Sequence, residues 1–250
     1  MKLFSLFLFI LWATSLYAKA KVIHIVVALC DNTYQGIVPV PSKIGNGQDP
    51  ATNLYWGCGY GIKSFLPKKD WKLIQSQYID TLLLERCIFY HSSSNAYIIA
   101  DAYNGKYIAT SIEQFLKYAA FQDSLKISFP KITLEAGGAA DLVVYVGHDG
   151  LMDFDVPTPE RTQWESSKPV MVFACISREY FSPHLKKLNS ILVVGSTGLM
   201  SAEAYTAEAA IKAWCNNEDN KSIANKAAIA YHTYQKCGLK AAQRLLITGY

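Results

Sequence analysis

Four short apolar runs constrain the fold of this chain more than any other feature. Each is rich in branched residues, and they span Val22 to Leu29, Leu142 to Val146, Val170 to Ala174 and Ile191 to Val194. Strands that are apolar on both faces are typical of a parallel sheet covered by helices. Helical patterns lie between and after these runs, over Ser111 to Ala120, Arg178 to Leu188, Ser201 to Trp214 and Ser222 to Lys236. The sequence therefore predicts an α/β protein with three layers, in which helices flank a mostly parallel sheet.

The stretch from Cys87 to Thr110 has a different pattern. Its β-type runs are Ile88 to Tyr90, Ala96 to Asp101 and Lys106 to Ala109. Polar residues 92–95 separate the first two runs, and Asn104-Gly105 separates the last two. An Asn-Gly pair between such runs indicates a type I′ hairpin. We therefore expect a small antiparallel hairpin excursion beside the parallel sheet.

The first twenty residues have the pattern of a secretory signal peptide. Lys2 precedes an apolar run from Leu3 to Leu16, and Ala18-Lys19-Ala20 fits a small-residue cleavage site. The run is shorter than the roughly 20 residues that a membrane-spanning helix needs. We expect a signal peptide over 1–20, a single α/β domain over 21–250 that is secreted or periplasmic, and no stable membrane span after cleavage.

Charge argues against nucleic acid as a partner. The formal net charge of the chain is +4. Loss of Lys2 and Lys19 with the signal peptide leaves 22 basic and 20 acidic side chains, a net charge of +2. No basic run stands out either, so the electrostatic footprint of a nucleic-acid-binding protein is missing from the sequence.

All six cysteines follow the signal peptide, in a compartment that permits disulfides. Their connectivity stays open, although an antiparallel helix pair would bring Cys215 and Cys237 together. If one cysteine is a free nucleophile, at least one more is unpaired within the chain, because five cannot pair off.

Two chemically reactive residues follow successive predicted strands. His148 comes after the run that ends at Val146, and Cys175 comes directly after the run that ends at Ala174. Successive parallel strands are often neighbours, about 4.8 Å apart, and their carboxyl ends share one edge of the sheet. A thiol beside an imidazole is suited to nucleophilic acyl transfer, because the imidazole stabilises the thiolate and protonates the leaving amine.

These motifs resemble the clan CD cysteine peptidases, the group of caspases, gingipains, legumains and clostripain. In that family, one apolar strand ends in His-Gly and a later one ends in Ala-Cys; here residues 142–150 read LVVYVGHDG and 170–175 read VMVFAC. The resemblance implies a caspase-hemoglobinase-like fold and a cysteine endopeptidase with a peptide or protein substrate and no cofactor. Cys175 would be the nucleophile and His148 the general acid and base. The backbone N–H groups of Cys175 and Asp149 would form the oxyanion hole.

One residue departs from the family pattern. Asp149 follows the histidine directly, and the glycine comes only at Gly150. A carboxylate at this place would reshape the turn or repel an oxyanion. The alternative function is therefore a non-catalytic exported binding protein that keeps the same fold.

Three further residues are candidates for substrate binding. In the resembled family the S1 pocket lies beside the strand that here ends before Ser196 and Thr197. Asp31, just after the first strand, would add a carboxylate that favours Arg or Lys at P1. The structural alternatives are a turn before the next helix for Ser196 and Thr197, and a capped turn for Asp31.

Cys58 is a rival nucleophile. It lies in Trp56-Gly57-Cys58-Gly59, which looks like the entry to a papain-type helix, and His148 with Asp153 would complete a triad. Papain-like folds place their histidine on an antiparallel sheet, whereas the run before His148 looks parallel. The aromatic residues near Cys58 suit either a binding surface or loop packing. No metal site is expected, because no second ligand lies close to His148 or Cys175 in the sequence.

Overall fold

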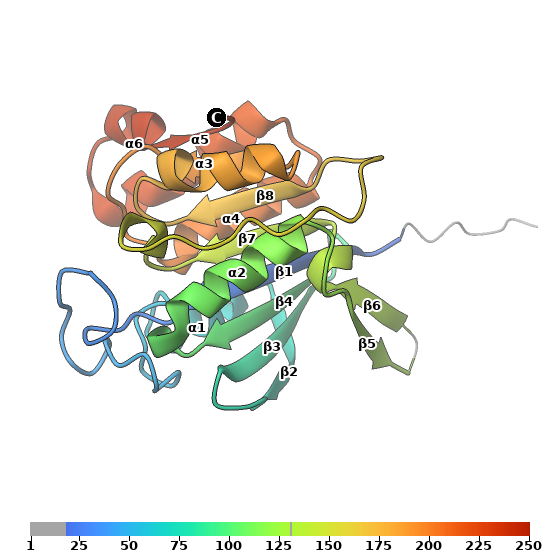
Figure 1. Cartoon of the computed structure of the whole chain (residues 1–250), viewed down its shortest axis with the longest axis horizontal. Coiled ribbons are helices and arrows are strands. Elements are labelled where there is room, and N and C mark those ends of the chain that lie inside the picture. The colour runs from blue at the N-terminus through green and yellow to red at the C-terminus, as the bar shows by residue number, and fades with distance from the viewer. Residues whose placement is uncertain (1–18, 131) are drawn as a thin grey trace, which may run out of the picture.

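The computed structural model describes residues 19–130 and 132–250, and the part of the expected signal peptide before Lys19 lies outside these ranges. One mixed sheet has the strand order β10-β9-β8-β7-β1-β4-β3-β2 (Figure 1). In chain order the strands are β1 (Lys21–Ala28), β2 (Lys72–Gln77), β3 (Leu83–His91), β4 (Ala96–Tyr103), β7 (Leu142–Val146), β8 (Pro169–Phe173), β9 (Ile191–Ser196) and β10 (Leu246–Ile247). From β4 to β9 neighbouring strands are parallel, and the strands on either side are antiparallel.

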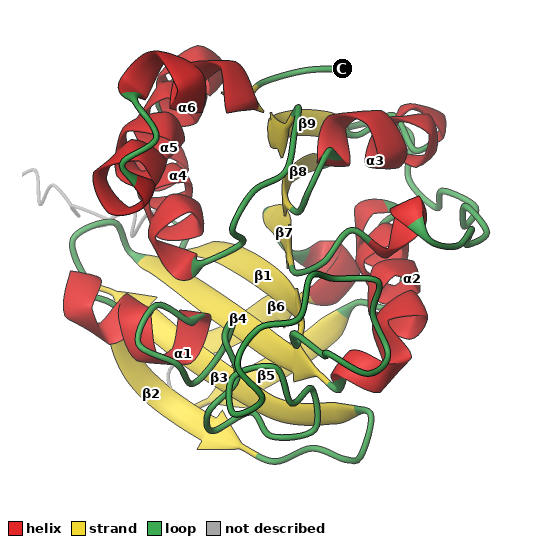
Figure 2. Ribbon diagram, turned by 90° about the vertical axis from the view of Figure 1, so that its left-hand side faces the viewer, coloured by secondary structure: helices red, strands yellow, loops and turns green. Residues whose placement is uncertain are grey.

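Helices cover both faces of this sheet. They are α1 (Ile62–Phe65), α2 (Ile108–Ala119), α3 (Ser177–Lys187), α4 (Ala204–Cys215), α5 (Asn220–Gln235) and α6 (Leu239–Leu245). Figure 2 shows α2 and α3 on one side and α1, α4 and α5 on the other. The predicted three-layer α/β architecture is therefore confirmed. None of the described helices has both the length and the apolar character needed to cross a membrane.

The core explains why the apolar runs become central strands. In β1, Ile23, Ile25 and Val27 pack in the cluster under α4 and α5, while Val22 and Val26 pack in the cluster under α2 and α3. Both sets are buried, so both faces of the strand remove apolar surface from water.

The antiparallel excursion exists, but its second turn was predicted incorrectly. Strands β3 and β4 form a hairpin through residues 92–95, as expected. Asn104-Gly105 makes no hairpin, because Asn104 Oδ1 accepts the Lys106 N–H at 3.1 Å and caps the 3₁₀ helix η2 (Gly105–Tyr107). The chain then continues into α2, so the run from Lys106 to Ala109 is helical.

A second, two-stranded sheet was not anticipated. It pairs β5 (Leu125–Phe129) with β6 (Ile132–Ala136) and projects from the main sheet in Figure 1. Alternating apolar and polar residues in both strands, with Pro130 between them, carry the signal that predicts such a hairpin.

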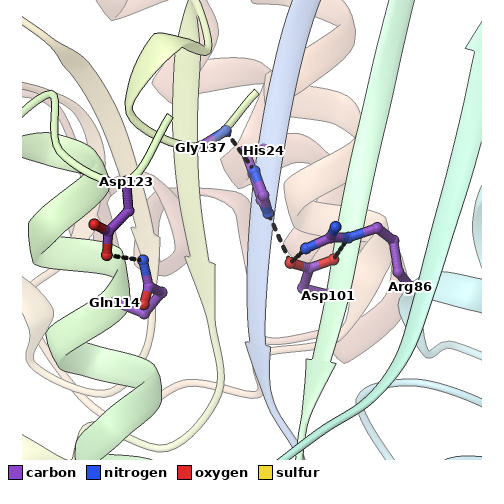
Figure 3. A network of polar contacts seen from close by, with 6 residues as sticks. All are labelled: His24, Arg86, Asp101, Gln114, Asp123 and Gly137. Carbon is purple, nitrogen blue, oxygen red and sulfur yellow. Dashed lines mark hydrogen bonds and ion pairs between the residues drawn. The ribbon is translucent and has the colours of Figure 1, made fainter. Parts of the chain in front are cut away.

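The centre of the sheet contains a buried polar network (Figure 3). His24 of β1 and Asp101 of β4 are fully buried, and His24 Nε2 lies 3.0 Å from Asp101 Oδ2. Arg86 of β3 donates two hydrogen bonds of 2.7 Å to the same carboxylate. The Gly137 N–H donates to His24 Nδ1 at 2.8 Å, so the ring proton is on Nε2 and is donated to Asp101. Both ring nitrogens of His24 and both carboxylate oxygens of Asp101 therefore have a partner.

Candidate functional site

The pairing of β7 with β8 places His148 and Cys175 at the same edge of the sheet. The two strands are parallel, with Val143 opposite Val170 and Val146 opposite Phe173. This offset of 27 residues also separates His148 from Cys175. The Gly147 N–H donates to Phe173 O at 3.2 Å, so hydrogen bonding continues past the last paired residues. Both candidate catalytic residues thus leave adjacent strands at matching positions.

His148 is oriented by a carboxylate in its own loop. His148 is only 8% exposed, and its Nε2 lies 2.7 Å from Asp153 Oδ2. The hydroxyl of Tyr145 donates to His148 O at 2.8 Å and holds the backbone of the turn. With Asp153 accepting from Nε2, the Nδ1 atom is the one left to accept a proton. Asp153 was considered with Cys58 from the sequence, but its place beside His148 serves a Cys175 site equally well.

Cys175 lies at a strained turn that leads into α3. The next residue, Ile176, is the N-cap of α3 and has a φ of 49°, in the left-handed region. A β-branched residue there costs about 1–3 kcal/mol, and such strain is concentrated at functional sites. The Ile176 N–H donates to Gly198 O at 2.9 Å, which ties the turn to the segment after β9.

The thiol of Cys175 contacts the main chain of Met200. Sγ donates to Met200 O at 3.4 Å and accepts the Met200 N–H at 3.3 Å. Burial raises the pKa of Cys175 above its ordinary value and the negative charge of Asp149 raises it further, while the Met200 N–H opposes both. The thiol is therefore protonated at neutral pH in this state, and no hydrogen bond joins it to His148 among the described contacts.

The two backbone groups expected to form the oxyanion hole are free to donate. Within the part of the chain that the structure describes, neither the Asp149 N–H nor the Cys175 N–H has an acceptor. The Cys175 N–H also lies directly before the N-terminal end of α3, where the helix dipole favours negative charge. These features suit the binding of an oxyanion.

Ser196 holds the turn around Cys175 in place through hydrogen bonds to the residues on either side of it. It is fully buried, and its Oγ donates to Ala174 O at 2.5 Å and accepts the Ser177 N–H at 3.1 Å. In return, the Ser196 N–H donates to Ser177 Oγ at 2.9 Å. All these partners belong to the protein, so the contacts of Ser196 join β9 to the residues on either side of Cys175 and Ile176.

Thr197 lies beside an open cleft. The cleft has a volume of about 630 Å³ and is lined by Ile176, Arg178, Glu179, Ser182, Pro183, Lys186, Thr197 and Tyr250. Thr197 itself is exposed, and its hydroxyl donates to Arg244 O at 2.8 Å. The cleft runs along α3 and includes Ile176, the residue after Cys175, whereas neither Cys175 nor His148 is among its lining residues.

Asp31 is bound within its own loop. Only 1% exposed, it accepts the Thr33 and Tyr34 N–H groups through Oδ1 at 2.8 and 3.1 Å. Its Oδ2 accepts from Gln48 Nε2 at 2.5 Å. These bonds match the structural alternative of a capped turn.

The surroundings of Cys58 differ from those that a papain-like site requires. His148 follows β7, which is parallel to both of its neighbours rather than part of an antiparallel sheet. In the Cys58 loop, Trp56 is fully buried and its Nε1 donates to Glu85 at 2.6 Å, so this aromatic residue serves loop packing. Half-exposed Tyr60 contacts Tyr205 and Tyr234.

The six cysteines, all within the described residues, are free, and the suggested pair of Cys215 and Cys237 is not bonded. Cys215 is buried and Cys237 is exposed. Across residues 19–130 and 132–250, no three His, Cys, Asp or Glu side chains are grouped to hold a metal ion.

Comparisons with protein-family models, with curated proteins and with solved structures found no significant match to this chain.

Proposed function

We propose that this protein is an exported cysteine endopeptidase of the caspase and gingipain type, with Cys175 as nucleophile and His148 as general acid and base. The observation that carries the proposal is the common offset of 27 residues, which puts both residues at the carboxyl ends of adjacent parallel strands. Reactive groups gather at this edge in parallel α/β sheets.

The arrangement suits peptide hydrolysis in two steps. In the first, His148 Nδ1 takes the thiol proton, Cys175 Sγ bonds to the carbonyl carbon, and the N–H groups of Cys175 and Asp149 stabilise the oxyanion. Collapse of this intermediate breaks the peptide bond, and His148 gives the proton to the leaving amine. In the second step, water attacks the thioester, His148 takes a proton from this water, and Cys175 leaves as a thiol.

Asp153 and Ser196 support this chemistry indirectly. Asp153 fixes the His148 ring through Nε2, which leaves Nδ1 for the thiol proton. Ser196 fixes the backbone around Cys175 through Ala174 O and the Ser177 N–H. The cleft along α3, which includes Ile176 directly after Cys175, offers space for a flanking segment of a peptide substrate.

Two variants test the proposal directly. Cys175→Ser is nearly isosteric and is expected to abolish hydrolysis of a fluorogenic peptide library while circular dichroism stays unchanged. His148→Ala is expected to slow both hydrolysis and the alkylation of Cys175 by iodoacetamide, measured on the Cys175 peptide by mass spectrometry. Cys58→Ser is the control, and hydrolysis that survives Cys175→Ser but not Cys58→Ser would reject the assignment.

A non-catalytic exported binding protein is the second candidate, and the state of the thiol favours it. The thiol of Cys175 bonds to Met200, and its pKa is raised. Resting sites often tighten only when substrate binds, so the two functions differ in reactivity rather than in resting geometry. Slow alkylation of Cys175 that His148→Ala leaves unchanged, together with no hydrolysis, would favour the binding protein.

A further inference from the structure

Asp149 places a buried carboxyl group in the turn between the two candidate catalytic residues. The residue is fully buried, and its Oδ1 accepts the Leu151 N–H at 3.1 Å. Its Oδ2 has no hydrogen-bond partner in the part of the chain that the structure describes. An ionised carboxylate oxygen without a donor is very costly to bury, whereas a neutral carboxyl group costs much less. The geometry therefore favours the protonated form of Asp149.

The groups around Asp149 do not offset a negative charge. The titratable groups that interact with it are Asp153 in the same loop, Tyr145 of β7 and Cys175 after β8. All three become negative when they ionise, and the ring of the adjacent His148 pairs with Asp153 rather than with Asp149. No basic side chain within residues 19–130 or 132–250 forms an ion pair with Asp149. Burial, with a smaller contribution from Asp153, raises the pKa of Asp149 to about 7 against the Leu151 hydrogen bond.

The charge on Asp149 acts directly on the thiol. A negative charge there raises the pKa of Cys175, in addition to the larger effect of burial. A neutral Asp149 removes this repulsion and leaves the Met200 N–H and the start of α3 to stabilise a thiolate. The residue that departs from the family pattern thus contributes, after burial and the Met200 N–H, to how easily Cys175 ionises.

We propose that Asp149 is a positioning residue that acts through Cys175: its neutral carboxyl group permits the thiolate, and its ionised form opposes it. Only one consequence rests on the proposed function: if the protein is a peptidase, it should hydrolyse peptides best in mildly acidic medium. The relation between Asp149 and the thiol can be measured without any substrate.

The experiment follows the alkylation of Cys175 by iodoacetamide, an uncharged probe, from about pH 5 to about pH 9, a range that spans the ionisation of both groups. The protein is the full mature chain, and mass spectrometry of the Cys175 peptide gives the rate. The variants are Asp149→Asn, which stays neutral, and Asp155→Asn, which removes an exposed carboxylate of the same loop.

In the wild type, the logarithm of the rate should rise with pH and then bend to a lower slope near pH 7, as Asp149 ionises. Asp149→Asn should match the wild type at acid pH, lose the bend and react about threefold to tenfold faster above pH 8, the effect of shifting a thiol pKa by half a unit to one unit. Asp155→Asn should keep the bend.

Two outcomes would overturn the inference: a wild-type curve with no bend near pH 7, or a folded Asp149→Asn protein that keeps the bend. If Asp149→Asn fails to fold, a wild-type curve without a bend still overturns the inference, and a bend that is lost in His148→Ala does so too, because it then belongs to the neighbouring imidazole. A bend without peptide hydrolysis would leave this inference standing and reject the peptidase. Hydrolysis that needs Cys175, combined with a curve without a bend, would do the reverse.

Discussion

His148 Nε2 lies 2.7 Å from Oδ2 of Asp153, a residue only five positions later in the chain. The 3₁₀ helix η4 (Gly150–Met152) turns the chain between them and brings the carboxylate back to the ring. The side chain of Asp153 is 41% exposed, whereas that of His148 is 9% exposed. A half-exposed carboxylate therefore orients a buried imidazole, and its main effect falls on ring orientation rather than on stability.

The first prediction concerns this orientation. Asp153→Asn still offers an oxygen to Nε2 but also offers an N–H, which favours the wrong ring tautomer. We expect kcat for peptide hydrolysis to fall about tenfold to a hundredfold, part of what general acid–base catalysis contributes. The midpoint of urea unfolding should change little.

Asp155→Asn, which alters an exposed carboxylate two residues away, is the matched control and should leave kcat unchanged. An equal loss of kcat in both variants would show that general loop charge, rather than the orientation of His148, is responsible.

The second prediction distinguishes Ser196, the last residue of β9, from Thr197, the residue after it. Ser196→Ala leaves Ala174 O and the Ser177 N–H without their partner, at a cost of about 1–3 kcal/mol in the free energy of unfolding. It should also lower kcat, because the backbone at Cys175 loses its support. Thr197→Ala should raise KM with little effect on stability, since Thr197 is exposed beside the cleft. Urea unfolding and steady-state kinetics check both, and an unchanged KM for Thr197→Ala would remove it from the substrate site.

The third prediction concerns the buried network of Figure 3. Burial by itself would raise the pKa of Asp101, but the contacts with His24 and Arg86 outweigh it and hold the pKa below its ordinary value. A lowered folded pKa stabilises the protein above the unfolded pKa of about 3.9, and this stabilisation is lost as the pH falls through the folded pKa. Asp101→Asn should cost about 3–5 kcal/mol at neutral pH, because Arg86 loses its buried counter-charge. Its stability should then depend less on pH in the acid range than that of the wild type.

Asp123→Asn is the control for this network. Asp123 contacts Gln114 at 3.0 Å and Lys117 at 3.7 Å, and its side chain is about half exposed. Because exposed ion pairs contribute about 1 kcal/mol or less, this variant should unfold close to the wild type in urea. A loss at Asp101→Asn no larger than that at Asp123→Asn would contradict the prediction.

The sequence predicted the central sheet well, because burial on both faces leaves a clear pattern of branched apolar residues. It was less informative where polar groups are buried in pairs. His24 lies inside the first apolar run, and the sequence around it does not indicate that it pairs with Asp101 on another strand or that Arg86 on a third strand binds the same carboxylate. Asn104 shows a second reason for error: an Asn-Gly pair suits a hairpin turn, but the same Asn side chain can also cap a helical turn, as it does here.

For the candidate site, the spacing of the apolar runs predicted that His148 and Cys175 follow adjacent parallel strands at one edge of the sheet, and the register of β7 and β8 agrees with this. The roles of side chains around them depend on contacts that spacing does not encode. Ser196 and Asp31 were expected to face substrate, and the hydrogen bonds that they make within the protein match the structural alternatives, so their substrate role stays a prediction. Asp153 was noticed for a different nucleophile, because only the folded loop shows how near it lies to His148.

The last prediction concerns export and the start of the domain. Cleavage at the Ala-x-Ala site gives a mature N-terminus at Lys19 or Lys21, and β1 begins at Lys21. Lys21 is anchored, since its N–H donates to Asn95 O at 3.1 Å and its Nζ donates to Cys215 O at 2.7 Å. Because these contacts begin at Lys21, either cleavage position preserves the first strand. N-terminal sequencing of the exported protein should find one of these two residues, and Lys21→Ala should lower stability by about 1 kcal/mol, the typical net value of one hydrogen bond. Exported protein that begins at Met1 would contradict the signal-peptide interpretation, and an unchanged unfolding midpoint in Lys21→Ala would show that the Nζ contact does not anchor the strand.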